Sequence, residues 1–169
     1  MNTKPLIAAG TLMGIGMGGF VDGILFHQIL QVHNMLSAKL PPDTLVNAKT
    51  NMVWDGLFHA LTWVATAISI GMLWNAVKRR DVPLSGDIFF GSLVLGWGIF
   101  NLVEGIIDHH ILGIHHVVEL HGLSIYDYLF LASGVLFILI GWVFIRKGSN
   151  DNSSSNVPQP YIPKSKSSN

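Results

Sequence analysis

One pattern of carboxylate, glycine and histidine occurs twice in this chain. The segment Asp22–His33 (DGILFHQILQVH) returns as Glu104–His115 (EGIIDHHILGIH), and the two align without a gap. We call the separation between their equivalent positions, such as 22 and 104, the repeat offset. Both copies lie in strongly apolar surroundings, where ionisable side chains are costly to bury and usually have a function. Carboxylate and imidazole ligands in a chain without cysteine suit Zn, Fe, Mn or Cu(II). The repeated pattern therefore predicts a transition-metal site.

A second pair of matching segments follows the first. Asp55–Ala60 (DGLFHA) corresponds to Asp127–Ala132 (DYLFLA), at the slightly shorter separation that takes 55 to 127. Asp55 and His59 are four residues apart and so share one face of a helix, which is good spacing for metal ligands. His59 breaks the repeat, because Leu131 is its counterpart.

These segments predict a mono- or dinuclear metal site made of histidines and carboxylates. The first candidates for its ligands are Asp22, His27, Asp55, His59, Glu104, His109 and His110. A second tier of candidates comprises His33, His115 and Asp127. The competing interpretation is a hydrogen-bonded polar network that joins the helices without any metal.

Helix geometry adds a condition to this site. His27 follows Asp22 by five residues, which on an ideal α-helix is a rotation of about 140°. Both side chains can point inward only if the helix contains a π-bulge or a break. Gly23 and Gly105 stand where such a defect forms most easily, and π-bulges occur frequently at functional sites. We therefore expect the same defect in both copies.

The setting of the site is a membrane. Hydrophobic residues make up 50% of the chain and charged residues 12%. Four apolar segments, roughly 5–30, 54–77, 88–112 and 125–145, are each near the ~20 residues that cross a hydrocarbon core. A lipid bilayer requires such segments to be helical. The predicted fold is an all-α four-helix membrane bundle, and the net charge of zero gives no indication of nucleic-acid binding.

The repeat and the composition together divide the chain. A membrane domain is predicted for residues 1–147, with repeat one at about 5–80 and repeat two at about 86–147. Each repeat contains two spans, so both keep one orientation, and a pseudo-two-fold axis along the membrane normal would relate them. Residues 148–169, rich in Ser, Asn, Pro and Lys, are predicted to form a disordered cytoplasmic tail.

The distribution of positive charge predicts the orientation. Lys4 precedes the first span, Lys78–Arg80 closes the second, and Arg146 with Lys147 closes the fourth. Four spans place all three clusters on one side, which the positive-inside rule makes cytoplasmic. Both termini would be inside the cell, and the metal site would lie near the extracytoplasmic face of a bacterial plasma (inner) membrane.

The motifs also resemble those of a known family. Asp-Gly-x3-His, Trp-Asp-Gly-Leu-Phe-His and Glu-Gly-x3-His-His, at residues 22–27, 54–59 and 104–110, are similar to segments of a bacterial family of four-span membrane proteins defined as a domain of unknown function. The resemblance covers roughly residues 8–145. It implies a four-span membrane protein and carries no activity with it.

Four functions fit these features. The first is a metalloenzyme, either an oxidoreductase or a hydrolase, acting on a lipid-soluble or periplasmic substrate. The second is a metal or proton transporter, although the nearly apolar cytoplasmic half argues against a through-pathway. The third is a haem protein with His27 and His109 as axial ligands. The fourth is a metal-delivery or assembly factor whose partner is a respiratory complex, and a homo-oligomer is also compatible with the sequence.

Overall fold

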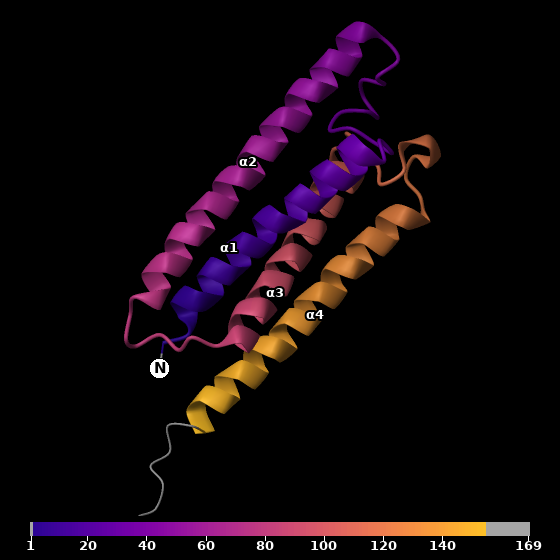
Figure 1. The fold of residues 1–169 in the computed structure, drawn as a ribbon. Helices are drawn as coiled ribbons and strands as arrows, with labels where there is room; N and C mark the ends of the chain where they lie inside the picture. The colour runs from indigo at the N-terminus through magenta and orange to yellow at the C-terminus, as the bar shows by residue number, and fades with distance from the viewer. Residues whose placement is uncertain (1, 155–169) are drawn as a thin grey trace, which may run out of the picture.

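Four long helices make up most of the protein (Figure 1). The computed structural model describes residues 2–154. In chain order the elements are α1 (Lys4–Val21), which continues as the π-helix η1 (Asp22–Ile29), α2 (Leu45–Val77), α3 (Gly86–Glu104), which continues as the π-helix η2 (Gly105–Ile111), the short 3₁₀ helix η3 (Glu119–His121), and α4 (Ile125–Ser154). All four helical spans are long and apolar enough to cross a membrane. The predicted all-α four-span architecture is confirmed.

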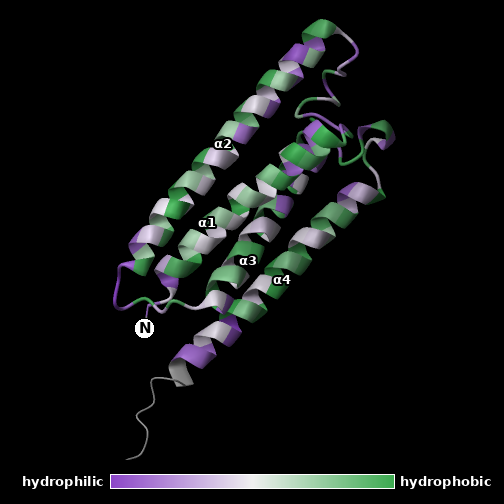
Figure 2. Cartoon of the chain, viewed as in Figure 1, coloured by the Kyte–Doolittle hydropathy of each residue, from purple (hydrophilic) through white to green (hydrophobic). Residues whose placement is uncertain are grey.

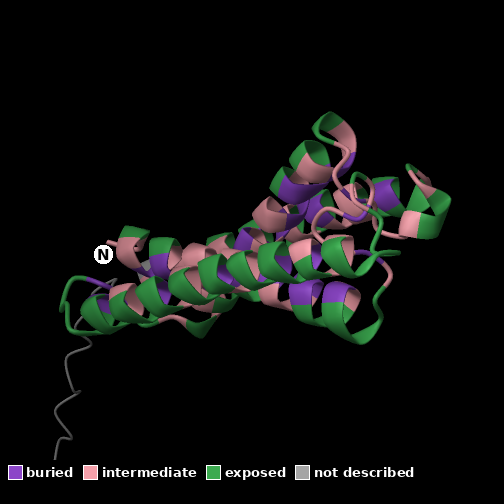
Figure 3. Cartoon of the chain, turned by 90° about the horizontal axis from the view of Figure 1, so that it is seen from above, coloured by how far each residue is buried: buried purple, intermediate pink, exposed green. Residues whose placement is uncertain are grey.

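The helices form a row in which α1 and α3 are central. α1 packs on both α2 and α3, and α4 packs on α3 (Figure 1). Buried residues make up 44% of the most apolar stretch of each central span but only 11% of each flanking one. Figure 3 shows exposed residues covering the outer faces of the helices. These faces are largely apolar along all four helices (Figure 2), as expected of surfaces that meet lipid.

Glycines allow α1 and α3 to approach closely. A Cβ atom on Gly14 would overlap the carbonyl group of Leu93, and one on Gly96 would overlap that of Thr11. The two contacts are equivalent by sequence, since the repeat offset takes 14 to 96 and 11 to 93. Small residues at such crossings let backbones meet in a membrane, where no hydrophobic effect drives helices together. This close crossing brings the two repeated motifs together.

The two ends of the bundle differ in chemistry. The start of α1, the connection from α2 to α3 and the end of α4 lie at one end, where the basic clusters also fall (Figure 1). The connections 30–44 and 112–124 lie at the other end, beside η1 and η2. Asn2 N donates to Asp81 O (2.8 Å) and holds the start of the chain to the first of these ends. The repeated ionisable residues all lie at the second end.

The last helix is longer than the sequence indicates. The predicted membrane domain ends at residue 147 and is followed by a disordered tail, whereas α4 continues through Ser154. Polar side chains there bond to the preceding turn, with Ser149 Oγ donating to Ile145 O (2.8 Å) and Asn152 Nδ2 to Gly148 O (2.6 Å). These local bonds support helix where composition indicates disorder. The rest of the predicted tail, 155–169, lies outside the described residues.

Candidate metal centre

Each central span changes from α- to π-helix at the repeated motif. Leu30 N donates to Leu25 O at the end of η1, and Leu112 N donates to Ile107 O at the end of η2, both at 2.8 Å. The π-helix pairs residues five apart, so Asp22 and His27 share one side of η1. The helix defect predicted from this spacing is confirmed, and it occurs in both copies.

Both π-helices end in a backbone conformation that turns the chain back over the site. Gln31 has φ 50° and Gly113 has φ 53°, two positions that are again related by the repeat offset. The left-handed region is rarely adopted by residues other than glycine, so Gln31 is a strained position. Because the chain reverses at these two turns, the histidines that follow them, His33 and His115, point back toward the motif.

His27 and His109 each lie between two carboxylates. His27 Nδ1 is 2.9 Å from Asp55 Oδ1, and its Nε2 is 3.1 Å from Asp22 Oδ2. His109 Nδ1 is 3.1 Å from Asp127 Oδ1, and its Nε2 is 3.4 Å from Glu104 Oε1. We call Nδ1, which faces Asp55 or Asp127, the outer nitrogen of each ring. Nε2, which faces Asp22 or Glu104, is the inner nitrogen.

His33 and His115 are each anchored by the other repeat. His33 Nδ1 donates to Val117 O (3.0 Å), and His115 Nδ1 donates to Met35 O (3.1 Å). Met35 and Val117 are also related by the repeat offset. The two imidazoles stack with centroids 4.8 Å apart and planes at 6°. The loops of the two repeats are thus joined reciprocally across the site.

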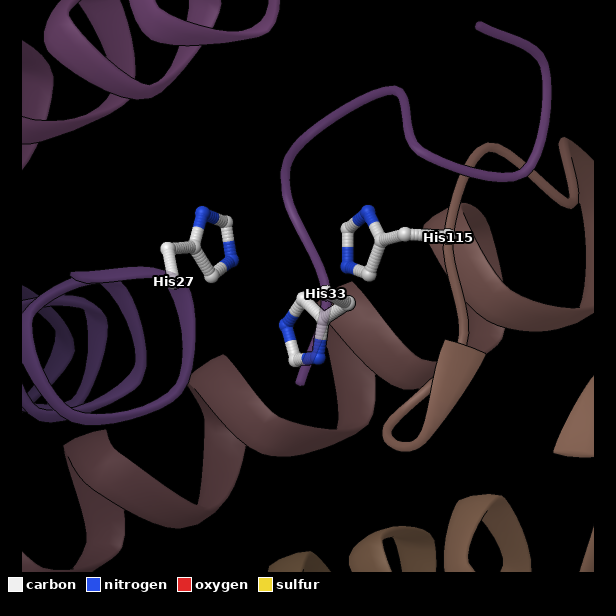
Figure 4. Close-up of side chains that lie close together, drawn as sticks. All are labelled: His27, His33 and His115. Atoms are coloured by element: carbon white, nitrogen blue, oxygen red, sulfur yellow. The ribbon is translucent and has the colours of Figure 1, made fainter. Parts of the chain in front are cut away.

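The inner nitrogen and oxygen atoms converge. Ligand atoms of His27, His33 and His115 lie within 4.8 Å of one another, and Figure 4 shows these three rings around a common space. Glu104, His109 and His115 form a second such group, which shares His115 with the first. Asp22 Oδ2 lies 3.1 Å from His27 Nε2 and so borders the first group. We call the two groups together with Asp22 the central cluster; it comprises Asp22, His27, His33, Glu104, His109 and His115.

Several inward-facing atoms of the central cluster lack hydrogen-bond partners among the described residues. They are Asp22 Oδ2, His27 Nε2, His33 Nε2, Glu104 Oε2 and His109 Nε2. Leaving a buried polar group unsatisfied costs about 1–3 kcal/mol, and more if it is charged. The ion pairs of the buried carboxylates described here are all with histidines. The donor set and its charge fit a cation.

Hydrogen bonds to carbonyl oxygens fix which ring nitrogen of two histidines carries a proton. Because a carbonyl oxygen only accepts, Nδ1 is protonated in His33, which faces Val117 O, and in His115, which faces Met35 O. The Nε2 of a neutral His33 ring then presents a lone pair. Burial, with His115 and His27 nearby, lowers the pKa of His33 to about 3, so its ring is neutral. Burial also disfavours charge on His115, but the hydrogen bonds to Glu104 and Met35 O and the negative charges of Glu104 and Asp22 together outweigh burial and raise the pKa of His115.

Asp55 and Asp127 are themselves held by hydrogen bonds. Asp55 accepts from Met35 N (2.8 Å) and Asn34 Nδ2 (3.0 Å). Asp127 accepts from Val117 N (3.0 Å) and from Ser124 N (2.8 Å), which precedes its own helix. Carboxylates that orient a histidine in this way are typical of the outer partners in metal sites.

Two of the predicted ligands lie away from the central cluster. His59 Nδ1 donates to Asp55 O and His110 Nδ1 to Gly105 O, each at 2.7 Å, and both rings are partly exposed. Neither belongs to the two groups of converging ligand atoms. His59 lies against Gly23, where a side chain larger than hydrogen would meet its ring. That these two histidines bind metal stays a prediction.

The structure instead brings two second-tier candidates into the centre. Asp22 and His33 are eleven residues apart, which on a continuous helix would separate them by ~16 Å along the axis. The helix ends before His33, at Ile29, and the left-handed turn returns the chain. The signal available in the sequence was that His33 and His115 recur at the same offset as His27 and His109.

A cavity leads from the outer loops toward the central cluster. It has a volume of about 640 Å³ and lies between the 30–44 loop and the η3 region. His33, Asn34, Ser37 and Glu119 are among its lining residues. Ser37 Oγ donates to Glu119 Oε2 (2.7 Å) across the two loops. The cavity gives the loop end of the bundle a polar approach to His33.

A family model described as "Predicted membrane protein (DUF2243)" matches residues 9–148. The chain belongs to this family. The match covers both repeats, including every residue of the central cluster, and agrees with the four candidate spans. No curated protein and no solved structure is similar enough to the chain to count as a match.

Proposed function

We propose that this protein is a metal-binding membrane protein that acts as a metal-dependent oxidoreductase or hydrolase at the extracytoplasmic face. One observation carries the proposal. Four buried imidazoles surround a shared space that contains two carboxylates. The Nε2 atoms of His27, His33 and His109 have no hydrogen-bond partner among the described residues, while Nδ1 of His27, His33 and His115 is hydrogen-bonded outside that space. A polar network without metal would be expected to pair its inner atoms as well as its outer ones.

The donor set limits the kind of ion. Four imidazole nitrogens with the carboxylates of Asp22 and Glu104, and no sulfur, suit Zn, Fe or Cu(II). The two groups of converging atoms share His115, so they support either one ion with many ligands or two ions bridged by a carboxylate. Asp55 and Asp127 would orient His27 and His109, as outer partners do in metal sites.

The geometry favours an ion over haem. Haem held by His27 and His109 would need a wide flat space between those two rings. His33 lies 4.5 Å from His27 and 6.4 Å from His109, centroid to centroid. His115 lies 5.7 Å and 4.9 Å from the same two rings. Both therefore fill the region that a macrocycle would need.

Transport across the membrane is supported less well than a site at one face. Hydroxyl groups deeper in the bundle bond within their own helices, with Thr66 Oγ1 donating to Thr62 O (2.9 Å), Ser69 Oγ to Thr66 O (2.7 Å) and Ser92 Oγ to Ile88 O (2.6 Å). These groups are satisfied locally and do not form a chain that would relay ions. A factor that delivers metal to a respiratory complex would use the same site. Unlike an enzyme, it would have to release the bound ion to its partner.

A bound ion would supply Lewis acidity or electron transfer, and the protein would supply its position. The cavity of about 640 Å³ would connect His33 with the solution at the loop end. Basic residues at the opposite end support an orientation with both termini in the cytoplasm of a bacterial cell. The contacts that recur at the repeat offset support a pseudo-two-fold axis that passes through the central cluster along the membrane normal.

Metal analysis of the purified full-length protein tests the proposal. We expect about one or two equivalents of Zn, Fe or Cu per chain by mass spectrometry, with ligand-field bands if the ion is Fe or Cu. Chelation should lower the melting temperature, because a ligand bound only to the folded state stabilises it. Protein that binds no transition metal on reconstitution, and melts unchanged with chelator, would leave the polar network as the better interpretation.

A further inference from the structure

A second, smaller cavity opens among α1, α3 and α4 at the depth of the membrane. Its volume is about 200 Å³. Four aromatic rings line it, those of Phe26, Trp97, Phe130 and Phe137. Trp97 and Phe137 meet edge to face with centroids 5.6 Å apart. For scale, an apolar cavity of about 150 Å³ holds benzene, so this one has room for a single substituted ring.

Besides Asp22 Oδ2, which belongs to the central cluster, the residues lining the cavity include one polar atom without a partner. Asn101, 4% exposed, is among the lining residues, and its Oδ1 has no hydrogen-bond partner among the described residues. Its Nδ2 donates to Ser133 Oγ (2.9 Å), and that hydroxyl donates in turn to Phe130 O (2.6 Å). Because the serine proton is already used, the serine oxygen can only accept, which fixes the orientation of the amide. Asn101 Oδ1 is therefore left without a donor among the described residues.

The corresponding place in the first repeat is filled. Phe100 is the equivalent of Gly18 by the repeat offset, and its ring packs against Gly19 and on Phe58, with ring centroids 6.1 Å apart. Gly19 and Leu61 occupy the positions equivalent to Asn101 and Ser133. One side of the bundle is therefore closed by an apolar ring. The other side is open and carries an acceptor.

We propose that this cavity binds a lipid-soluble molecule with one aromatic ring and a hydroxyl donor, such as the head group of a hydroquinone. The ring would lie among the four aromatic side chains, and the hydroxyl would donate to Asn101 Oδ1. Asp22 also lines the cavity, so the molecule would reach a residue of the central cluster. Such a molecule would be the substrate class of the proposed function. Only its role as a substrate, through the approach to Asp22, rests on that function.

Binding of two matched probes tests the inference. The full-length protein in lipid nanodiscs is titrated with 4-methylphenol and 4-methylanisole, which share a ring but differ in the donor, and empty nanodiscs are subtracted. We expect saturable binding of the phenol with roughly tenfold preference over the ether, the value of one hydrogen bond to a buried acceptor. Equal affinity for the two probes would overturn the inference. A third probe, 1-decanol, carries a hydroxyl without a ring, and decanol binding as tight as the phenol would also overturn it.

Three variants and one control connect the preference for the phenol to this cavity. Asn101→Leu should bind both probes alike, whereas a preference that survives this change would contradict the assignment. Gly18→Leu should abolish saturable binding, because a Cβ there already lies 2.8 Å from Trp97 Cδ1. Gly71→Leu is its control, since nothing lies within 4 Å of that Cβ position. Ser133→Leu, which introduces the residue of the first repeat, blocks the cavity independently if Gly18→Leu does not fold.

Metal content separates this inference from the proposed function. All variants and the chelated wild type are measured for metal and for probe binding. Donor-dependent probe binding in protein that never takes up metal would support the cavity and contradict the metal site. Metal-loaded protein without saturable phenol binding would leave the metal site in place and end the inference.

Discussion

The two repeats build similar half-sites but differ around them. In the first, His27 lies between Asp22 and Asp55; in the second, His109 lies between Glu104 and Asp127. The π-helices, the left-handed turns and the reciprocal histidine anchors also recur at the same offset. Outside this centre the repeats diverge.

The divergence is concentrated where the site meets its surroundings. His59 stands where the second repeat has Leu131, and Phe100 stands where the first repeat has Gly18. Asp55 takes a hydrogen bond from Asn34, whereas the residue equivalent to Asn34, His116, has its Nδ1 3.5 Å from Asp127. The residue types kept in both halves are those that an ion would contact or that orient its ligands. Those that differ in this comparison lie around the central cluster and outside it.

Loss of His33 or of His115 is the strongest test of the centre that the two repeats share. His33→Ala and His115→Ala should each reduce metal affinity by more than about 100-fold, beyond the roughly 10–100-fold typical of losing an outer partner. Each variant removes one converging Nε2 and unpairs a backbone carbonyl of the other repeat. Metal titration with mass spectrometry measures the loss, with the exposed His121→Ala as control. Affinity unchanged in either variant would remove that histidine from the ligand set.

Substitution of Asp55 or Asp127 should lower metal affinity less than loss of a central histidine, and by a similar factor in the two repeats. Asp55→Asn and Asp127→Asn keep the shape of the side chain but remove the negative charge beside Nδ1 of His27 and of His109. We expect metal affinity to fall by about 10–100-fold in each variant. A large effect in one and none in the other would show that the ion belongs to one half-site, which would break the comparison.

Helix packing tests whether the halves are mechanically equivalent. Gly14→Ala and Gly96→Ala each place a methyl group against a backbone carbonyl of the opposite central helix. Overpacking of this kind costs about 1–3 kcal/mol of unfolding free energy. Denaturant titration in detergent should give similar losses for the two variants and none for Gly71→Ala. Unequal losses would indicate that the crossing is not equivalent from the two sides.

His59 provides the smallest expected effect and the sharpest test of asymmetry. His59→Leu introduces the residue of the second repeat, and because His59 lies outside the converging ligand atoms we expect metal content to stay within about twofold of wild type. Leu131→Ala is measured beside it as a packing control. A sharp loss of metal in His59→Leu with an unchanged melting temperature would return His59 to the ligand set, as the sequence alone suggests.

The sequence by itself determined the membrane setting, the four helices and the ionisable residues that lie within them. Apolar segments of this length can only be helices in lipid, because no water is present to satisfy their backbone groups. The repeat also located the helix defects, since Asp22 and His27, five residues apart, cannot face one way on an α-helix. These are local consequences of residue type and spacing.

The roles within the site were decided only by the tertiary structure. The sequence ranked His59 and His110 above His33 and His115. Eleven residues on a continuous helix would place His33 ~16 Å from Asp22 along the axis. The left-handed turn at Gln31, and the anchoring of His33 by Val117 of the other repeat, bring it back. A contact between residues so distant in the chain depends on how α1 and α3 cross. Local propensity carries no information about that crossing, so only the packed structure shows which side chains converge.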